Sequence, residues 1–167
     1  MKLLSRREFL KTGVAGSFLL AFSGWINAAG VRGLSDVERE MLAAVTGVIL
    51  DGALPKEGAA RQQLVMRTVD GIASAVSGLS LATQKEIGEL LGLLVLAPAR
   101  IVIAGVGRPW REASPADVAG FLDAWRNSRF GLLRSAYAAL HDLILGAWYA
   151  QPDAWEAIGY PGPPEVF

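Results

Sequence analysis

The sequence has no cysteine and only one histidine, His141, among its 167 residues. Without a thiol, the chain cannot form a disulfide framework, a thiolate zinc site, a cysteine-ligated iron–sulfur cluster or a cysteine nucleophile. One histidine cannot supply the two or three ligands of a histidine metal site. A Ser-His-Asp hydrolase would also need a G-x-S-x-G turn, which the sequence lacks. We therefore expect no metal site and no catalytic residue in this chain.

Nucleotide-binding loops are missing as well. The run Gly105-Val106-Gly107 begins like a dinucleotide loop, but Trp110 takes the place of its third glycine and no βαβ pattern surrounds it. We expect no cofactor in this chain. His141 could relay a proton to a cofactor of a partner, but a half-buried position on a helix is the interpretation we favour.

The charges balance, with sixteen basic and sixteen acidic residues. This balance argues against nucleic acid as a partner, because nucleic-acid-binding domains are basic. The net charge of zero is the sum of two parts of opposite charge. Residues 1–29 hold four basic residues and one acidic residue, whereas residues 30–167 hold twelve and fifteen. The larger part is therefore mildly acidic.

Residues 1–29 have the three-part pattern of an export signal. A basic stretch leads into an apolar run from Gly13 to Phe22, and small residues follow. The run SRREFLK at 5–11 resembles the twin-arginine motif of the bacterial pathway that exports folded proteins. The matching positions are Ser5, Arg6, Arg7, Phe9, Leu10 and Lys11. We therefore predict a twin-arginine signal helix, with the translocase of that pathway as a partner.

The fate of this signal has two alternatives. Small residues near Ser23 and Ala28 permit cleavage, which we favour. The uncharged stretch from Thr12 to Val31 is also about twenty residues long, which is enough to span a bilayer as a retained anchor. We expect a periplasmic protein associated with the inner membrane.

Residues 30–167 show apolar spacing near 3.6 residues and little strand alternation, which predicts a small all-α domain. A capping box formed by Ser35 and Glu38 predicts a helix that ends near Asp51. Further helices are expected over about 59–76 and from about Ser80 to Pro98.

One long carboxy-terminal helix is expected to follow. Ser114-Pro115 is a typical helix start, and the helix would run to Tyr149 over about 50 Å. Gly131 and Gly146 could bend or break it. The run PGPP at 161–164 cannot be helical, so we expect an extended proline-rich tail.

The run LLGLLVLAPARIVIAGVG at 90–107 raises the question of a second membrane span. Pro98 interrupts it, and Arg100 would cost at least about 2.5 kcal/mol at the centre of a bilayer. A buried helical hairpin or a kinked core helix is therefore favoured over a span.

The carboxy-terminal half is rich in arginine and tryptophan, and the stretch 100–134 has no lysine. Arginine and aromatic residues dominate protein–protein hot spots, which favours an interface with another protein. The alternative is a set of core tryptophans beneath a solvated arginine face. The predicted interface residues are Arg108, Trp110, Arg126, Arg129, Trp148, Tyr149, Trp155 and Tyr160.

A series of short segments in this order resembles the small-subunit family named gluconate 2-dehydrogenase subunit 3. After the twin-arginine signal come GRPW at 107–110, ASP at 113–115, WR at 125–126, AWY at 147–149 and WEAIGY at 155–160, followed by the proline-rich end. The resemblance covers most of the chain, and its most specific part is the WEAIGY ending.

The resemblance implies a non-catalytic subunit that escorts a folded dehydrogenase through the inner membrane. The large partner in that family is a flavoprotein of the glucose-methanol-choline type that carries FAD, often accompanied by a cytochrome c subunit with haem c. Its substrates are alcohols, sugars or sugar acids. Some relatives have a cysteine near the carboxy terminus, and any role of that thiol is excluded here.

Two other functions stay open at this point. The chain could be a self-sufficient periplasmic protein that binds a lipid or small molecule in an apolar interior around Leu90 to Ile103. It could also be a membrane-anchored assembly factor that does not remain in the mature complex.

Overall fold

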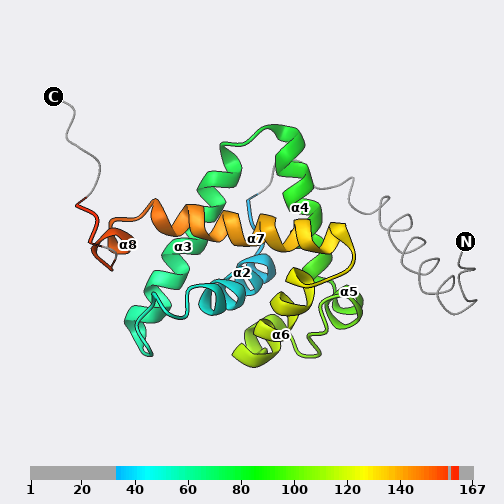
Figure 1. The fold of residues 1–167 in the computed structure, drawn as a ribbon. Coiled ribbons are helices and arrows are strands. Elements are labelled where there is room, and N and C mark those ends of the chain that lie inside the picture. Colours follow the sequence, from blue (N-terminus) through cyan, green and yellow to red (C-terminus); the bar gives the residue numbers. More distant parts are fainter. Residues whose placement is uncertain (1–32, 158, 162–167) are drawn as a thin grey trace, which may run out of the picture.

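The computed structural model describes residues 33–157 and 159–161, which form the helical domain drawn in Figure 1. The prediction of an all-α domain is confirmed, and the described part of the chain contains no strand. The elements are α2 (Asp36–Ile49), α3 (Ala59–Ser77), α4 (Leu81–Val95), α5 (Ala97–Val102), η1 (Trp110–Glu112), α6 (Pro115–Arg126), α7 (Gly131–Tyr149) and α8 (Pro152–Ala157). The predicted signal at 1–29 and the tail beyond Pro161 lie outside the described residues.

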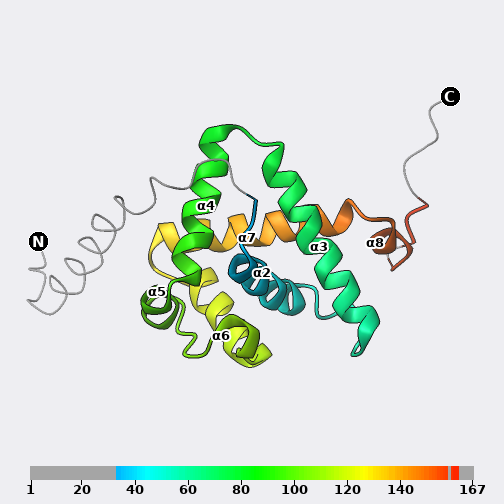
Figure 2. The ribbon, with the colours of Figure 1, turned by 180° about the vertical axis from the view of Figure 1, so that it is seen from behind.

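Helix α2 begins at the predicted capping box and lies at the centre of the domain. The backbone N–H and the hydroxyl of Ser35 donate to Glu38 Oε2 at 2.8 and 2.6 Å, and the hydroxyl accepts from the Glu38 N–H. Met41, Leu42 and Val45 recur on one face and are fully buried. This face lets α2 pack against α3, α4, α6 and η1. Figures 1 and 2 show α2 between the surrounding helices.

The apolar run at 90–107 forms a kinked pair of helices, as the favoured interpretation of this run predicted. Helix α4 ends at Val95, and Leu96 is extended with a ψ of 123°. Helix α5 begins at Ala97 with Pro98 in its first turn, where the missing N–H of proline costs nothing. Within the described ranges, no helix combines the length and the apolar character that crossing a membrane requires.

The prediction of one long helix from Pro115 to Tyr149 is wrong. Helix α6 ends at Arg126, and the separate helix α7 begins at Gly131. Asn127 caps α6 by donating to the backbone oxygen and the side chain of Asp123 at 3.1 and 2.8 Å. Since these hydrogen bonds satisfy the polar groups that the break exposes, the chain can turn and place α7 against α3.

The turn between α6 and α7 is closed by further polar contacts. The Ser128 hydroxyl accepts from the Phe130 N–H at 3.1 Å, and Arg134 donates to the Ser128 carbonyl at 2.6 Å. Gly146 lies inside α7 without interrupting it.

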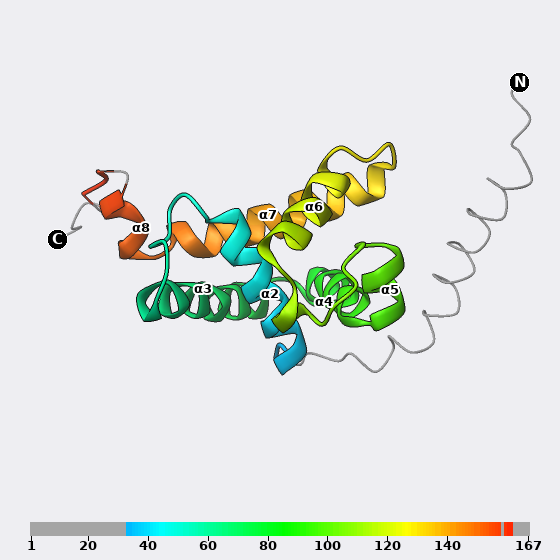
Figure 3. The ribbon, with the colours of Figure 1, turned by 90° about the horizontal axis from the view of Figure 1, so that it is seen from below.

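The domain has two separate ends in all three views. Helix α8 lies at one end, and α5 lies with the start of α7 at the other, which is clearest in Figure 3. Residues of α8 and of α5 therefore lie at opposite ends of the domain.

Candidate functional site

Two of the predicted interface residues are in the core. Trp110 is 2% exposed and Trp148 is 3% exposed. The indole N–H of Trp110 donates to the Leu94 carbonyl at 2.8 Å, so the polar atom of this side chain is also satisfied inside the domain. This finding corrects the prediction that Trp110 and Trp148 contact a partner.

The buried residues Trp110 and Trp125 form an aromatic cluster with Phe121 that fixes α5 and η1 against α6. The ring of Phe121 lies 5.7 Å from that of Trp110 and 4.8 Å from that of Trp125, both edge to face. Trp125 also donates to the Ile103 carbonyl at 3.1 Å. Because this bond joins the end of α6 to the end of α5, the two segments share one end of the molecule.

The other predicted aromatic residues gather at the opposite end, which we call the α8 end and define by Tyr149, Trp155 and Tyr160. Tyr149 is 48% exposed and Tyr160 is 45% exposed. The indole N–H of Trp155 donates to the Tyr149 carbonyl at 2.8 Å, and its ring meets that of Tyr160 edge to face at 5.7 Å. The backbone N–H of Tyr160 donates to the Trp155 carbonyl at 2.9 Å. These contacts fold the segment after α7 back onto the end of that helix.

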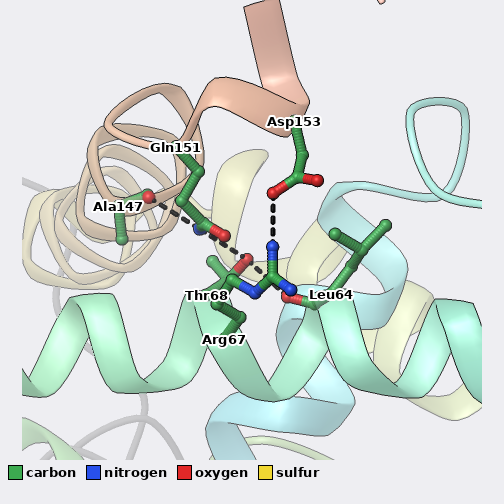
Figure 4. Close-up of polar contacts among 6 residues, drawn as sticks. All are labelled: Leu64, Arg67, Thr68, Ala147, Gln151 and Asp153. Atoms are coloured by element: carbon green, nitrogen blue, oxygen red, sulfur yellow. Dashed lines mark hydrogen bonds and ion pairs between the residues drawn. The ribbon is translucent and has the colours of Figure 1, made fainter.

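Polar contacts attach the α8 end to α3, as Figure 4 shows. Arg67 pairs with Asp153 at 2.5 Å, and Gln151 donates to the Thr68 hydroxyl at 3.2 Å and to the Ala147 carbonyl at 2.9 Å. The ion pair is about half exposed, so it contributes no more than about 1 kcal/mol to stability. Since Arg67 and Asp153 are far apart in the chain, no sequence pattern could have indicated their contact.

Two of the three predicted arginines lie in or beside the turn between α6 and α7. Arg126 and Arg129 are exposed, and the guanidinium of Arg129 lies 4.8 Å from the centre of the Phe130 ring. Phe130 is 50% exposed and Leu132, in the first turn of α7, is 69% exposed. Phe130 and Leu132 are not among the predicted interface residues.

Helix α5 adds three exposed apolar residues to the same end of the domain. Ile101 is 50% exposed, Val102 is 81% exposed and Ile103 is 36% exposed. The apolar run at 90–107 was expected to be interior as far as Ile103, whereas Leu91 and Leu94 of α4 are the leucines of this run that are fully buried. We call this surface the arginine–apolar end. It consists of Ile101, Val102, Ile103, Arg126, Arg129, Phe130, Leu132 and Arg134.

The arginine–apolar end carries three arginines, and the nearest acid in the chain is Asp123, one helical turn before Arg126. No acidic residue occurs between Ala124 and His141. Among the described residues, no ion pair involves Arg126, Arg129 or Arg134, whereas Arg67 and Arg111 each pair with a carboxylate. This end is therefore positive on a domain that is mildly acidic as a whole.

Arg108 is exposed and lies between α5 and η1, within electrostatic reach of the first turn of α6. The hydroxyl and the backbone N–H of Ser114 donate to Asp117 and hold the pKa of that carboxyl below its ordinary value. The charge of Arg108 lowers the same pKa further. In this structure Arg108 therefore acts on a helix cap.

His141 is partly exposed on α7, as the favoured interpretation expected. Its ring stacks on that of Tyr137 at 5.7 Å, and Nδ1 lies 3.3 Å from Asp142 Oδ1. In the part of the chain that the structure describes, no three acidic or histidine side chains are placed to hold a metal ion together.

The eight predicted interface residues are thus divided among the core, the α8 end, the arginine–apolar end and the cap of α6. Comparison of the chain with models of known families, with curated proteins and with solved structures matches none of them.

Proposed function

We propose that this chain is a non-catalytic subunit that escorts a folded flavin-dependent dehydrogenase into the periplasm. The observation that carries the proposal is the twin-arginine run at 5–11 in front of a helical domain. The resemblance to the gluconate 2-dehydrogenase subunit 3 family supports it and indicates an alcohol, a sugar or a sugar acid as the substrate of the partner.

Export in the folded state has a physical reason in such a complex. FAD is inserted into the dehydrogenase inside the cell, so the dehydrogenase must cross the membrane with its fold complete. A partner without a signal of its own can then travel on the signal of this chain. The flavin belongs to the partner, and haem c belongs to a cytochrome c subunit where one completes the complex.

The α8 end is the surface that we assign to the dehydrogenase. Tyr149 and Tyr160 are half exposed there, next to the partly buried Trp155. Tyrosine and tryptophan are enriched at the hot spots of protein interfaces because they bury a large area at a small entropic cost. The hydrogen bonds of Trp155 and Tyr160 hold this cluster in one conformation before any partner binds.

The escort role is tested by replacing Arg6 and Arg7 together by lysine. We expect both this chain and the dehydrogenase activity to stay in the cytoplasm, since the exporter recognises the arginine pair. The measurement is sugar or alcohol oxidation with an artificial electron acceptor in separated periplasmic and cytoplasmic fractions. Lys2→Arg, outside the motif, is the matched control and should leave export unchanged.

Dehydrogenase activity that still reaches the periplasm in the double variant would show that the escort role is wrong. Purification of the chain alone tests the alternative function: a well-folded chain that retains a small molecule would support a self-sufficient binding protein.

A further inference from the structure

The arginine–apolar end exposes several large apolar side chains that the rest of the domain leaves uncovered. Val102 and Leu132 are 81% and 69% exposed, and they come from the end of α5 and the start of α7. Ile101 and Phe130 are each half exposed beside them in the chain. Exposed apolar residues gathered at one end of a domain mark a surface that is covered by something else.

The charge of the same end indicates what covers it. Arg126, Arg129 and Arg134 are exposed there, and none of them takes part in the ion pairs of the described residues. A guanidinium group binds phosphate with two parallel hydrogen bonds, so three of them suit a surface of phosphate groups.

We propose that the arginine–apolar end binds the anionic surface of a phospholipid bilayer. In this arrangement Val102, Leu132 and their apolar neighbours enter the headgroup layer, while the arginines contact lipid phosphates. Apolar burial and attraction to anionic lipids together give interfacial binding without a membrane span.

The composition of this end favours lipid over a protein partner. Valine and leucine are under-represented among the hot spots of protein interfaces, yet Val102 and Leu132 are its most exposed apolar residues. The tyrosines that suit a protein interface are Tyr149, which ends α7, and Tyr160, which follows α8, and α8 lies at the opposite end (Figure 3). Binding of lipid by one end therefore leaves the α8 end free for another protein.

The test uses the absence of native cysteine, which allows single labelled positions in the full chain. Val102→Cys and Leu132→Cys are each labelled with an environment-sensitive fluorophore. Leu81→Cys is the matched control, because Leu81 is 68% exposed. It is the first residue of α4, and α5 follows the opposite end of that helix. Each protein is mixed with vesicles of phosphatidylcholine and phosphatidylglycerol, or of phosphatidylcholine alone.

We expect a blue shift and quenching by brominated lipid at positions 102 and 132 with phosphatidylglycerol vesicles, and neither at 81. Because the readout is local, it reports contact of this end even where the amino-terminal segment itself binds the vesicle. Arg126→Gln with Arg129→Gln should weaken the contact about fivefold per arginine. Lysine at both positions should restore only part of it, because an ammonium group keeps the charge but cannot form the two parallel hydrogen bonds. Circular dichroism verifies that each variant keeps its helices.

Three outcomes would overturn the proposal. The labels at 102 and 132 could stay unchanged, all three labels could change equally, or the change could appear only when a dehydrogenase is added. The last outcome would assign this end to a protein partner. No dehydrogenase is present in the vesicle measurement, so failure of the escort role would leave its result intact.

Discussion

At the scale of single residues, Arg100, the charge that argued against a membrane span, is buried and stabilises a loop. It is 7% exposed, and its guanidinium donates to the Val106 carbonyl at 3.1 Å. The backbone N–H of Val106 donates in return to the Arg100 carbonyl at 3.0 Å. Gly105, whose φ is 72°, allows the chain to turn between them. Arg100 therefore closes the loop that positions the exposed end of α5.

Replacing Arg100 by methionine should lower the free energy of unfolding by about 1.5 to 3 kcal/mol, because a buried charged hydrogen bond is lost. Arg111→Met is the control: Arg111 is exposed and pairs only with its neighbour Glu112, so a change below about 1 kcal/mol is expected. Urea unfolding measures both. Equal losses in the two variants would contradict the role given to Arg100.

The cap of α6 should make stability depend on pH. Since hydrogen bonds from Ser114 lower the pKa of Asp117 below 3.8, the cap stabilises the fold above that ordinary pKa. The stabilisation is lost as the pH falls through the lower pKa of the folded state. Unfolding curves of the protein and of Asp117→Asn should therefore differ near pH 6 and draw together as the pH falls through the lowered pKa of Asp117. Ser114→Ala should show a weaker pH dependence, and an unchanged one would argue against the hydrogen bonds as the cause.

At the scale of elements, the close packing of α3 on α7 depends on a small residue. A Cβ atom at Gly71 would lie 3.4 Å from the Cβ of Ala147, which is an ordinary contact distance. The site therefore has room for one methyl group and for little more. At Gly146 of α7, by contrast, an added Cβ atom would have no other atom within 4 Å, and the residue is exposed.

Gly71→Ala should raise the free energy of unfolding by about 0.5 to 1 kcal/mol, because alanine loses less backbone entropy in a helix. Gly71→Leu should lower it by about 1 to 3 kcal/mol through overpacking against Ala147. At Gly146 both substitutions should be tolerated, and thermal unfolding compares the four variants. A stable Gly71→Leu variant would show that α3 and α7 can separate without cost.

The break between α6 and α7 belongs to this scale as well. Helix starts are encoded within a few residues, and the predicted cap at Ser114 is present. The end of α6 depends on Asn127 and on the packing of α7 in the core. The positions of glycine residues alone therefore did not predict where α6 ends. Of the two glycines considered, only Gly131 lies at a helix boundary.

At the scale of the whole molecule, one core joins nearly all the elements. Trp110 of η1, Trp125 of α6 and Trp148 of α7 are all buried in it. Fluorescence of these residues therefore reports the packing of the domain, while far-ultraviolet circular dichroism reports its helices.

A chain that begins at Gly33 should unfold in a single transition, with coincident midpoints by the two probes. The reason is that, in the described part of the chain, one cluster of buried residues joins the helices into a single core. Two separated midpoints would show that α5 or α8 unfolds independently of the core.

The sequence by itself determined the helical class, the caps at Ser35 and Ser114 and the kink at Pro98. These features rest on hydrogen bonds and apolar spacing within a few residues, which do not depend on distant parts of the chain. Only the tertiary structure decided that Trp110 and Trp148 are buried and that the predicted interface is divided between two ends. Burial is set by which segments pack together, and residues of the same type therefore reach the core or the surface according to contacts that no local pattern records.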